Sequence, residues 1–327
     1  MALHLNLEKK DLSRYLQGSG WIDSNETVSH VSKAGDGNMN LTLRVQTNSR
    51  QFILKQSRPW VEKYPHIEAP QDRILTEACF YEIASRNFHL KKHMPNMIHL
   101  DQENRIMMLE DLGNCPDLTT VYHDQTLQTT QLDQLLTFLD HLYATSVSSN
   151  ENKLHNREMR TLNHFHIFVF PFEPHNGLNL DQHCHGLSRI ASHVCSNEPL
   201  KKKIADYGKR YLADGDTLLH GDFFPGSWLQ SENHMYVIDP EFCFLGPKEF
   251  DVGILQAHLL LAKHPVHIMA DILEKLRHHH LISHHVESFC GIEMLRRLLG
   301  VAQLPLSLNL EEREYRIELA MEMILSE

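Results

Sequence analysis

Residues 220–227 read HGDFFPGS and residues 237–242 read VIDPEF, and these two stretches decide the fold. Each places acidic side chains after a short apolar run: Asp222 in the first and, 17 residues later, Asp239 with Glu241 in the second. Carboxylates on neighbouring loops can divide the work of phosphoryl transfer, because one accepts a hydroxyl proton while the others hold a metal ion. An isolated Asp after a strand is usually a turn residue. The pairing of the two loops therefore favours phosphoryl-transfer chemistry.

A second set of residues lies upstream and follows an order that suits nucleotide phosphates. Gly35, Asp36 and Gly37 are expected to form a tight turn, and Lys55 is expected to lie inside an otherwise apolar strand. A glycine turn brings backbone N–H groups close to phosphates, and a lysine on the next strand can reach them. Glu77 lies on the following predicted helix, where it can pair with Lys55. The glycine turn, the lysine and the glutamate are each weak evidence alone. Their order along the chain is what predicts a site for nucleotide phosphates.

The first third of the chain is predicted to form a small sheet. Five strands are expected, over residues 28–33, 40–46, 52–56, 97–100 and 105–109. One helix is expected over residues 70–87, where apolar residues recur at three- and four-residue steps.

The chain beyond Gly113 changes character and is predicted to be mostly helical. Helices are expected over residues 125–146 and 200–213, and over residues 248–326 with breaks near Pro265, Leu281 and Gly300. The aromatic stretch 164–177, which contains two prolines and a glycine, is expected to be an irregular connector. We therefore expect an α+β protein with a lobe at 1–111 and a larger lobe at 112–327.

Composition excludes several classes of protein. The chain has 327 residues with 31 basic and 42 acidic side chains, a net charge of −11, which argues against nucleic acid and anionic membrane surfaces as partners. No apolar run is long enough to span a bilayer, and the first ten residues lack the profile of a signal peptide. The six cysteines form no CxxC pair, which favours buried thiols and the cytoplasm.

Several longer motifs resemble one known superfamily. HGDFFPGS and VIDPEFCFLGPKEFDVG are similar to the aminoglycoside phosphotransferase and choline kinase superfamily, a small-molecule branch of the protein-kinase-like fold. Within it, the DPE sequence and a late twin arginine resemble the methylthioribose kinase branch. The resemblance extends over nearly the whole chain through GDGNMNLTLRV, ILKQSRPWV, DRILTEA, MLEDL and GIEMLRRLLGVA. It implies a bilobal fold, with an antiparallel sheet and a helix in the smaller lobe.

The resemblance also implies roles for individual residues in the larger lobe. Asp222 would be the catalytic base, and Arg296 with Arg297 would face the sugar and the transferring phosphoryl group. Magnesium would be held by Asp239, Glu241 and Ser227, since oxygen ligands suit that hard ion. Ser227 stands where most of the wider superfamily has Asn, and the methylthioribose kinase branch also has serine there.

For the smaller lobe, the resemblance implies that ATP is the cofactor. The residues expected to contact it are Gly35, Asp36, Gly37 and Asn38 of the turn, Lys55 with its partner Glu77, and Glu110 and Leu112 of a hinge that pairs with adenine.

The implied reaction is transfer of the γ-phosphoryl group of ATP to the C1 hydroxyl of 5-methylthioribose, a step of methionine salvage. Another pentose, an amino alcohol or an aminoglycoside would require the same chemistry and stays open as the acceptor. A nucleotide-binding pseudokinase with a regulatory role is the alternative of a different class. The resemblance further suggests a homodimer.

Other polar residues are given structural roles. Asp251 is expected to anchor the Asp222 loop, and His220 to orient that loop through hydrogen bonds. Histidine is abundant, with 25 residues, and the clusters at 278–280 and 284–285 are expected to be solvated. No cysteine or carboxylate spacing completes a recognisable metal site around them.

Overall fold

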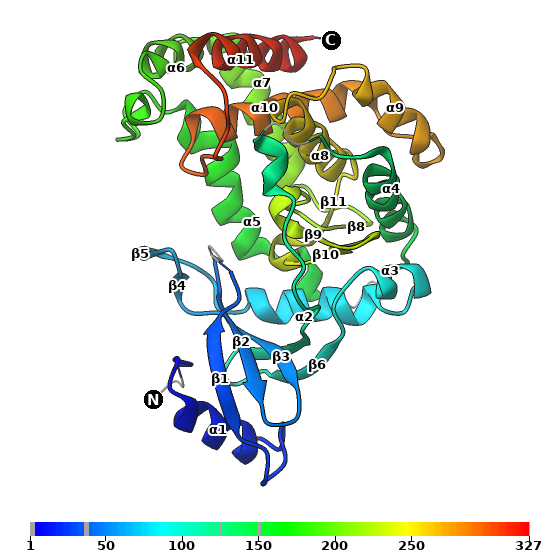
Figure 1. Cartoon of the computed structure of the whole chain (residues 1–327). Coiled ribbons are helices and arrows are strands. Elements are labelled where there is room, and N and C mark those ends of the chain that lie inside the picture. The colour runs from blue at the N-terminus through cyan, green and yellow to red at the C-terminus, as the bar shows by residue number, and fades with distance from the viewer. Residues whose placement is uncertain (1–3, 36–38, 124–125, 149–151, 327) are drawn as a thin grey trace. The chain divides into compact units, whose positions relative to one another are not determined.

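A computed structural model describes residues 4–35, 39–123, 126–148 and 152–326 (Figure 1). The chain divides into two compact units, Met1–Cys115 and Pro116–Glu327. Each unit has its own core.

The N-terminal unit is built on a five-stranded antiparallel sheet with the order β1-β2-β3-β7-β6. Its strands are β1 (Val28–Lys33), β2 (Leu41–Thr47), β3 (Gln51–Gln56), β6 (Met97–Asp101) and β7 (Ile106–Glu110). All five predicted strands are confirmed. Lys55 lies on the central strand, opposite Thr42 of β2 and Met107 of β7.

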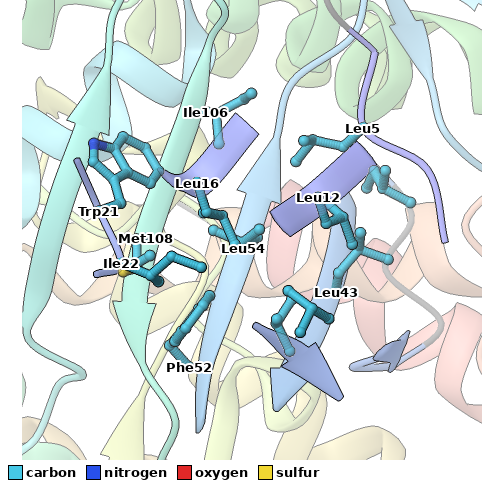
Figure 2. Packing of buried hydrophobic residues seen from close by; sticks show 13 residues of the cluster. Leu5, Leu12, Leu16, Trp21, Ile22, Leu43, Phe52, Leu54, Ile106 and Met108 are labelled. Atoms are coloured by element: carbon cyan, nitrogen blue, oxygen red, sulfur yellow. The ribbon is translucent and has the colours of Figure 1, made fainter. Parts of the chain in front are cut away.

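Helix α1 (Lys9–Gly18) covers one face of this sheet and was not predicted. Leu12 and Leu16 lie four residues apart, so they share one face of the helix. They pack with alternate sheet residues, among them Leu54 of β3 and Met108 of β7, in a buried apolar cluster (Figure 2). The signal for α1 was this short spacing, which polar neighbours obscured.

The opposite face of the sheet belongs to α2 (Arg73–Ala84), which confirms the single helix predicted in this region. Lys55 follows Leu54 and therefore points to the other side of the sheet, where α2 meets it. Three further elements complete the unit: α3 (Phe88–Lys92), β4 (Trp60–Val61) and β5 (Tyr64–Glu68).

The C-terminal unit is mainly helical, and the α+β class is confirmed. Its helices are α4 (Thr129–Tyr143), α5 (Arg157–His164), α6 (Leu187–Cys195), α7 (Glu198–Leu212), α8 (Glu249–Leu261), α9 (Ile268–Lys275), α10 (Ser283–Leu299) and α11 (Leu310–Leu325). The predicted breaks near Pro265, Leu281 and Gly300 fall between the last four of these helices.

Two short antiparallel ladders carry the loops of interest in this unit. Strands β8 (Thr217–Leu219) and β11 (Phe244–Gly246) form one ladder, and β9 (Trp228–Ser231) pairs with β10 (His234–Val237) in the other.

The prediction of an irregular connector over 164–177 was wrong for its first half. Helix α5 continues into a π-helix, η3 (Phe165–Val169), and then a 3-10 turn, η4 (Phe170–Phe172). Phe168 packs against Tyr211 and Phe289, with ring centroids 5.3 and 6.4 Å apart. Tertiary packing of this apolar stretch therefore sustains helical structure up to the 3-10 turn, which begins at Phe170 and contains Pro171.

Helices α8 and α10 form the centre of the C-terminal unit. Every residue of α8 is buried. The two helices approach closely at Gly253, where a Cβ atom would lie 2.7 Å from Cβ of Phe289 and 2.9 Å from the Val286 carbonyl oxygen. On the other side of α10, a Cβ atom at Gly291 would lie 2.5 Å from the Ala320 carbonyl oxygen of α11. Glycine is therefore required on both sides of α10.

Four of the six cysteines are buried and all six are free thiols, as expected: Cys79, Cys195, Cys243 and Cys290 are the buried ones. Among the residues that the structure describes, none of the helices has the length and apolar character needed to span a bilayer.

We predict that Gly253→Ala lowers the free energy of unfolding by about 1–3 kcal/mol, because the added methyl group overpacks the contact between α8 and α10. Urea unfolding measures this change. Gly18→Ala is the matched control, since that helical glycine has open space around it. The control variant should be as stable as the parent or slightly more stable. A Gly253→Ala variant of undiminished stability would contradict the close packing.

Candidate active site

The loop after β8 is held against a second loop by a glycine. Gly221 has φ +84, and a Cβ atom there would lie 2.0 Å from the carbonyl oxygen of Phe242. Phe242 ends the short 3-10 turn η7 (Pro240–Phe242), which begins directly after Asp239. The backbones of the Asp222 and Asp239 loops therefore touch, as the pairing of the two sequence stretches predicted.

Asp251, in the first turn of α8, anchors the Asp222 loop. Its carboxylate oxygens accept hydrogen bonds from the backbone N–H groups of His220, at 2.7 Å, and Gly221, at 2.9 Å. Burial raises the pKa of Asp251 to about 7, although the two backbone hydrogen bonds oppose the shift. The predicted anchoring role is confirmed.

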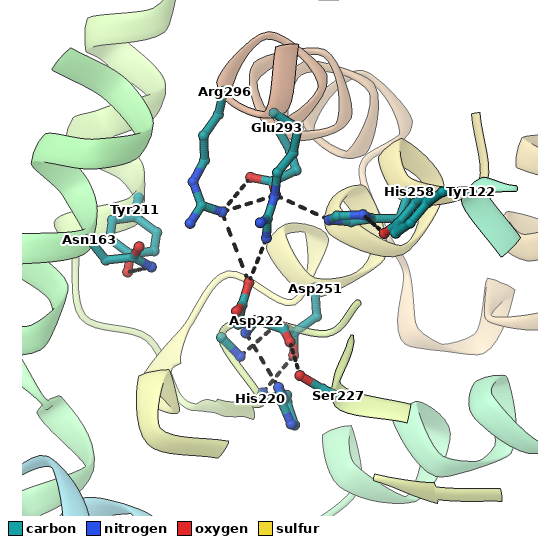
Figure 3. A network of polar contacts seen from close by, with 12 residues as sticks. Tyr122, Asn163, Tyr211, His220, Asp222, Ser227, Asp251, His258, Glu293 and Arg296 are labelled. Carbon is teal, nitrogen blue, oxygen red and sulfur yellow. Dashed lines mark hydrogen bonds and ion pairs between the residues drawn. The ribbon is translucent and has the colours of Figure 1, made fainter. Parts of the chain in front are cut away.

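His220 and Ser227 hold the backbone around Asp222 (Figure 3). The buried imidazole of His220 contacts the Ile238 carbonyl oxygen through Nε2, at 2.9 Å, and accepts the Asp222 N–H at Nδ1, at 3.4 Å. The hydroxyl of Ser227, which ends the turn η6 (Pro225–Ser227), donates to the Asp222 carbonyl oxygen at 3.1 Å. The predicted role of His220 in orienting the loop is confirmed.

The end of α10 brings both predicted arginines to Asp222. An Nη atom of Arg297 donates to the Asp222 carboxylate at 3.2 Å, and an Nη atom of Arg296 lies 4.0 Å from the same oxygen. Both guanidinium groups are largely buried, while the Asp222 side chain is 20% exposed. Arg297 also lies over the Phe224 ring, 4.8 Å from its centre. Neither arginine is therefore solvated, although adjacent residues of a helix point about 100° apart.

Glu293 makes the burial of two arginines tolerable, and sequence reasoning missed it. Its carboxylate accepts from Arg296 at 3.0 Å to each oxygen and from Nε of Arg297 at 2.5 Å. Burial alone would raise the pKa of Glu293, but the charges of Arg296 and Arg297 hold it well below its usual range. The available signal was spacing, since Glu293 precedes the arginines by three and four residues of a helix.

A buried histidine extends this network away from Asp222. His258 of α8 contacts Glu293 through Nε2 at 3.2 Å and the Tyr122 hydroxyl through Nδ1 at 2.5 Å. Tyr122 ends the short turn η1 (Thr119–Tyr122). Burial lowers the pKa of His258 to about 4, so its imidazole is neutral near pH 7. Sequence reasoning also missed His258 and Tyr122, which come from distant parts of the chain.

The predicted metal ligands lie on the second loop and beside it. Asp239 has φ +60, a left-handed conformation that Asp tolerates better than most residues. Glu241 is buried, and its carbonyl oxygen accepts from the side chain of Asn156 at 3.1 Å. Together with the Ser227 hydroxyl, these residues supply the oxygen donors that Mg²⁺ prefers.

In the N-terminal unit, Lys55 and Glu77 form the predicted ion pair. Nζ of Lys55 lies 2.7 Å from the Glu77 carboxylate, and both side chains are almost fully buried. The pair joins β3 to α2.

The remaining predicted nucleotide contacts are only partly described. The carboxylate of Glu110 accepts from the side chain of Asn96 at 2.6 Å, and Leu112 is half-buried. Gly35 is exposed, with φ +155. Asp36, Gly37 and Asn38 lie outside the described residues.

The neutral state of His258 predicts a pH-dependent stability. In the unfolded chain this histidine becomes protonated as the pH falls below about 6.5. In the folded chain it becomes protonated only near pH 4, so acid favours the unfolded state. The stabilisation is therefore complete above about pH 6.5 and is lost on acidification, by on the order of 2 kcal/mol at pH 5. Glu293, whose pKa is lowered, acts only below about pH 4.5.

We expect His258→Gln to lose about 2 kcal/mol less free energy of unfolding between pH 7.5 and pH 5 than the parent chain. Urea unfolding at the two pH values measures the difference. His193→Gln, on the exposed side of α6, controls for the loss of a histidine as such. Equal acid sensitivity of the His258→Gln variant and the parent would show that His258 is not kept neutral by burial.

Comparison with known proteins places this chain in a family. The sequence profile of the phosphotransferase enzyme family (APH) matches residues 30–280. A protein named methylthioribose kinase from Exiguobacterium sibiricum is 26% identical over 257 residues, which cover 74% of this chain and 63% of that relative. The methylthioribose kinase of a Geobacillus species is 24% identical over 336 residues, which cover 87% of this chain and 81% of that relative. This chain thus matches less than two thirds of the Exiguobacterium protein.

Solved structures agree on the fold. A spectinomycin phosphotransferase in complex with ADP and spectinomycin superposes with a TM-score of 0.56 at 15% identity, covering 98% of this chain and 99% of the other. The choline kinase LicA from Streptococcus pneumoniae superposes with a TM-score of 0.52 at 14% identity, covering 97% and 99%. These likenesses confirm the expected kinase-like fold. With the family profile matched over most of its length, the chain belongs to the phosphotransferase enzyme family.

Proposed function

We propose that this protein is an ATP-dependent kinase that transfers the γ-phosphoryl group to the C1 hydroxyl of 5-methylthioribose. The relatives named methylthioribose kinase support the acceptor, and the ADP-bound spectinomycin phosphotransferase supports the nucleotide. The observation that carries the proposal is the contact between Asp222 and the buried arginine pair of α10.

Asp222 is the proposed acceptor of the hydroxyl proton. Its backbone N–H donates to His220, its carbonyl oxygen accepts from Ser227, and the loop before it is fixed by Asp251. The carboxylate is the part that stays partly exposed. A fixed backbone with an accessible carboxylate suits a group that must meet a hydroxyl in a defined orientation.

Arg296 and Arg297 are proposed to stabilise the charge that develops on the transferring phosphoryl group. A guanidinium donates several N–H bonds in a plane and so matches phosphate oxygens. Among the side chains that the structure describes, Arg296 has a buried Nε atom that makes no hydrogen bond. Glu293 offsets one of the two positive charges and holds both side chains in place, so little reorganisation is required when the phosphoryl group arrives.

Asp239, Glu241 and Ser227 are the residues proposed to hold Mg²⁺, because all three offer oxygen donors on the two touching loops. When bound, the ion would neutralise charge on the nucleotide phosphates.

In the N-terminal unit, Lys55 is proposed to contact the nucleotide phosphates, and Glu77 to keep its ammonium group in place. Glu110 and Leu112, with Gly35 and the neighbouring Asp36, Gly37 and Asn38, complete the proposed nucleotide contacts. The assignment of residues 1–111 to a nucleotide-binding lobe and 112–327 to a catalytic lobe stays a prediction, as does the homodimer.

The charge of the site supports a neutral acceptor. The two guanidinium groups next to Asp222 already pair with the carboxylates of Asp222 and Glu293, so neither carboxylate is free to bind the ammonium group of a cationic amino alcohol or aminoglycoside. A pentose is neutral and needs no carboxylate partner in this site.

We predict that Asp222→Asn lowers kcat by about 10²- to 10⁴-fold and leaves the Kd for ATP nearly unchanged, because the amide cannot accept the hydroxyl proton. ADP release measures the first quantity and calorimetric titration the second. Asp216→Asn is the matched control, an exposed acidic residue six positions earlier that should keep full turnover. Unchanged turnover in Asp222→Asn would show that Asp222 is not the base that accepts the hydroxyl proton.

The acceptor is tested by ADP release with 5-methylthioribose, 5-deoxyribose, ribose, choline and an aminoglycoside. We expect the highest kcat/KM with 5-methylthioribose, and at least about tenfold lower values with the two cationic acceptors. Comparable values for all five would contradict the proposed acceptor and leave phosphoryl transfer standing. Absence of acceptor-dependent ADP release, together with tight ATP binding, would instead identify a regulatory nucleotide-binding protein.

A further inference from the structure

Two adjacent histidines and a carboxylate converge on the surface of the C-terminal unit. His278 and His279 lie in the short turn η8 (Arg277–His279), and Asp140 lies near the end of α4. Nε2 of His278 is 2.6 Å and Nε2 of His279 is 2.7 Å from the same oxygen of Asp140. The sequence did not reveal a carboxylate that completes this cluster, since Asp140 is 138 residues from His278.

The three side chains have the composition of a transition-metal site. Their ligand atoms all lie within 4.8 Å of one another. Two imidazoles and one carboxylate suit Zn²⁺ and its neighbours in the first transition series, whereas Mg²⁺ prefers oxygen ligands alone. Ligands of a tetrahedral Zn²⁺ ion, each at about 2.0–2.1 Å, lie about 3.3 Å apart. The imidazole nitrogens, which are 2.6 and 2.7 Å from the Asp140 oxygen, therefore need to move away from it by about 0.6–0.7 Å.

The surroundings of His279 hold it in place. The ring of Tyr143 meets the His279 ring edge-on, with centroids 5.4 Å apart. Lys248 donates from Nζ to the His279 carbonyl oxygen, and its own carbonyl oxygen accepts from the Tyr143 hydroxyl at 3.1 Å. Such outer contacts orient metal ligands and contribute to metal affinity.

The cluster is also accessible from solvent. The side chain of His278 is 58% exposed, that of Asp140 is 37% exposed, and that of His279 is 12% exposed. An ion held by these three residues would keep further coordination positions open to water. The same two chain segments are joined nearby by the ion pair between Lys275 of α9 and Asp133 of α4, which limits how far the ligands can separate.

We propose that Asp140, His278 and His279 form a binding site for a divalent transition-metal ion, with Zn²⁺ as the ion best matched to this donor set. The site is separate from the proposed magnesium ligands and has different donor chemistry. A bound ion would link α4 to the connection between α9 and α10. Because it binds the folded chain through residues 138 positions apart, it would stabilise the C-terminal unit.

Zn²⁺ titration of the untagged full chain by calorimetry, in excess Mg²⁺, tests the proposal. We expect one equivalent to bind more tightly than the remaining histidines do, and His278→Gln to weaken this equivalent by at least about tenfold. Asp140→Asn should have a similar effect. His280→Asn is the matched control, because it removes the neighbouring histidine and Asn tolerates the left-handed backbone at this position, φ +53. It should bind Zn²⁺ like the parent.

A second measurement does not depend on a variant of Asp140, whose loss could disturb α4. Co²⁺ in place of Zn²⁺ should give the visible absorption of a nitrogen- and oxygen-ligated ion, and His278→Gln should remove it. Two outcomes would overturn the proposal: binding of no tight equivalent by the parent chain, or full retention of that equivalent in His278→Gln. Loss of binding in His280→Asn equal to that in His278→Gln would likewise reject the assigned ligands.

Discussion

The rest of the candidate site depends on the ion pairs that Glu293 makes with Arg296 and Arg297. Two guanidinium groups cannot be buried side by side without a counter-charge, because desolvation and mutual repulsion both oppose it. Glu293 binds both, and in return their charges keep its own pKa low. Asp222 then meets a cluster in which one negative charge already balances one of the two positive charges.

Four separate segments supply this arrangement (Figure 3). Helix α10 carries Glu293 with both arginines, the loop after β8 carries Asp222, and α8 and η1 add His258 and Tyr122. The close approach of α8 to α10 at Gly253 allows His258 to reach Glu293. The position of the charged cluster therefore depends on the packing of the helical core.

Local patterns in the sequence predicted much of the fold. Strand-like runs separated by turns revealed the sheet of the N-terminal unit, and the pairing of Lys55 with Glu77 followed from their positions on a strand and the next helix. Loop chemistry revealed that the Asp222 and Asp239 stretches belong together. Contacts made by tertiary packing were not visible, and for this reason α1, the helical stretch over Phe165–Phe172 and the contact of His258 with Tyr122 were missed. Glu293 could have been predicted from the sequence, since it precedes the two arginines by three and four residues of a helix.

Helix α8 carries two contacts that serve the same loop from different sides. Asp251 holds the backbone before Asp222, and His258, seven residues later, supports the cluster that faces the Asp222 carboxylate. Seven residues make nearly two helical turns, about 10.5 Å, so both side chains lie on one face of α8. The helix therefore fixes the distance and the relative direction of the Asp251 and His258 side chains. An inserted or deleted residue between them would rotate one end by about 100° and break the alignment, which leaves the length of this segment no freedom to vary.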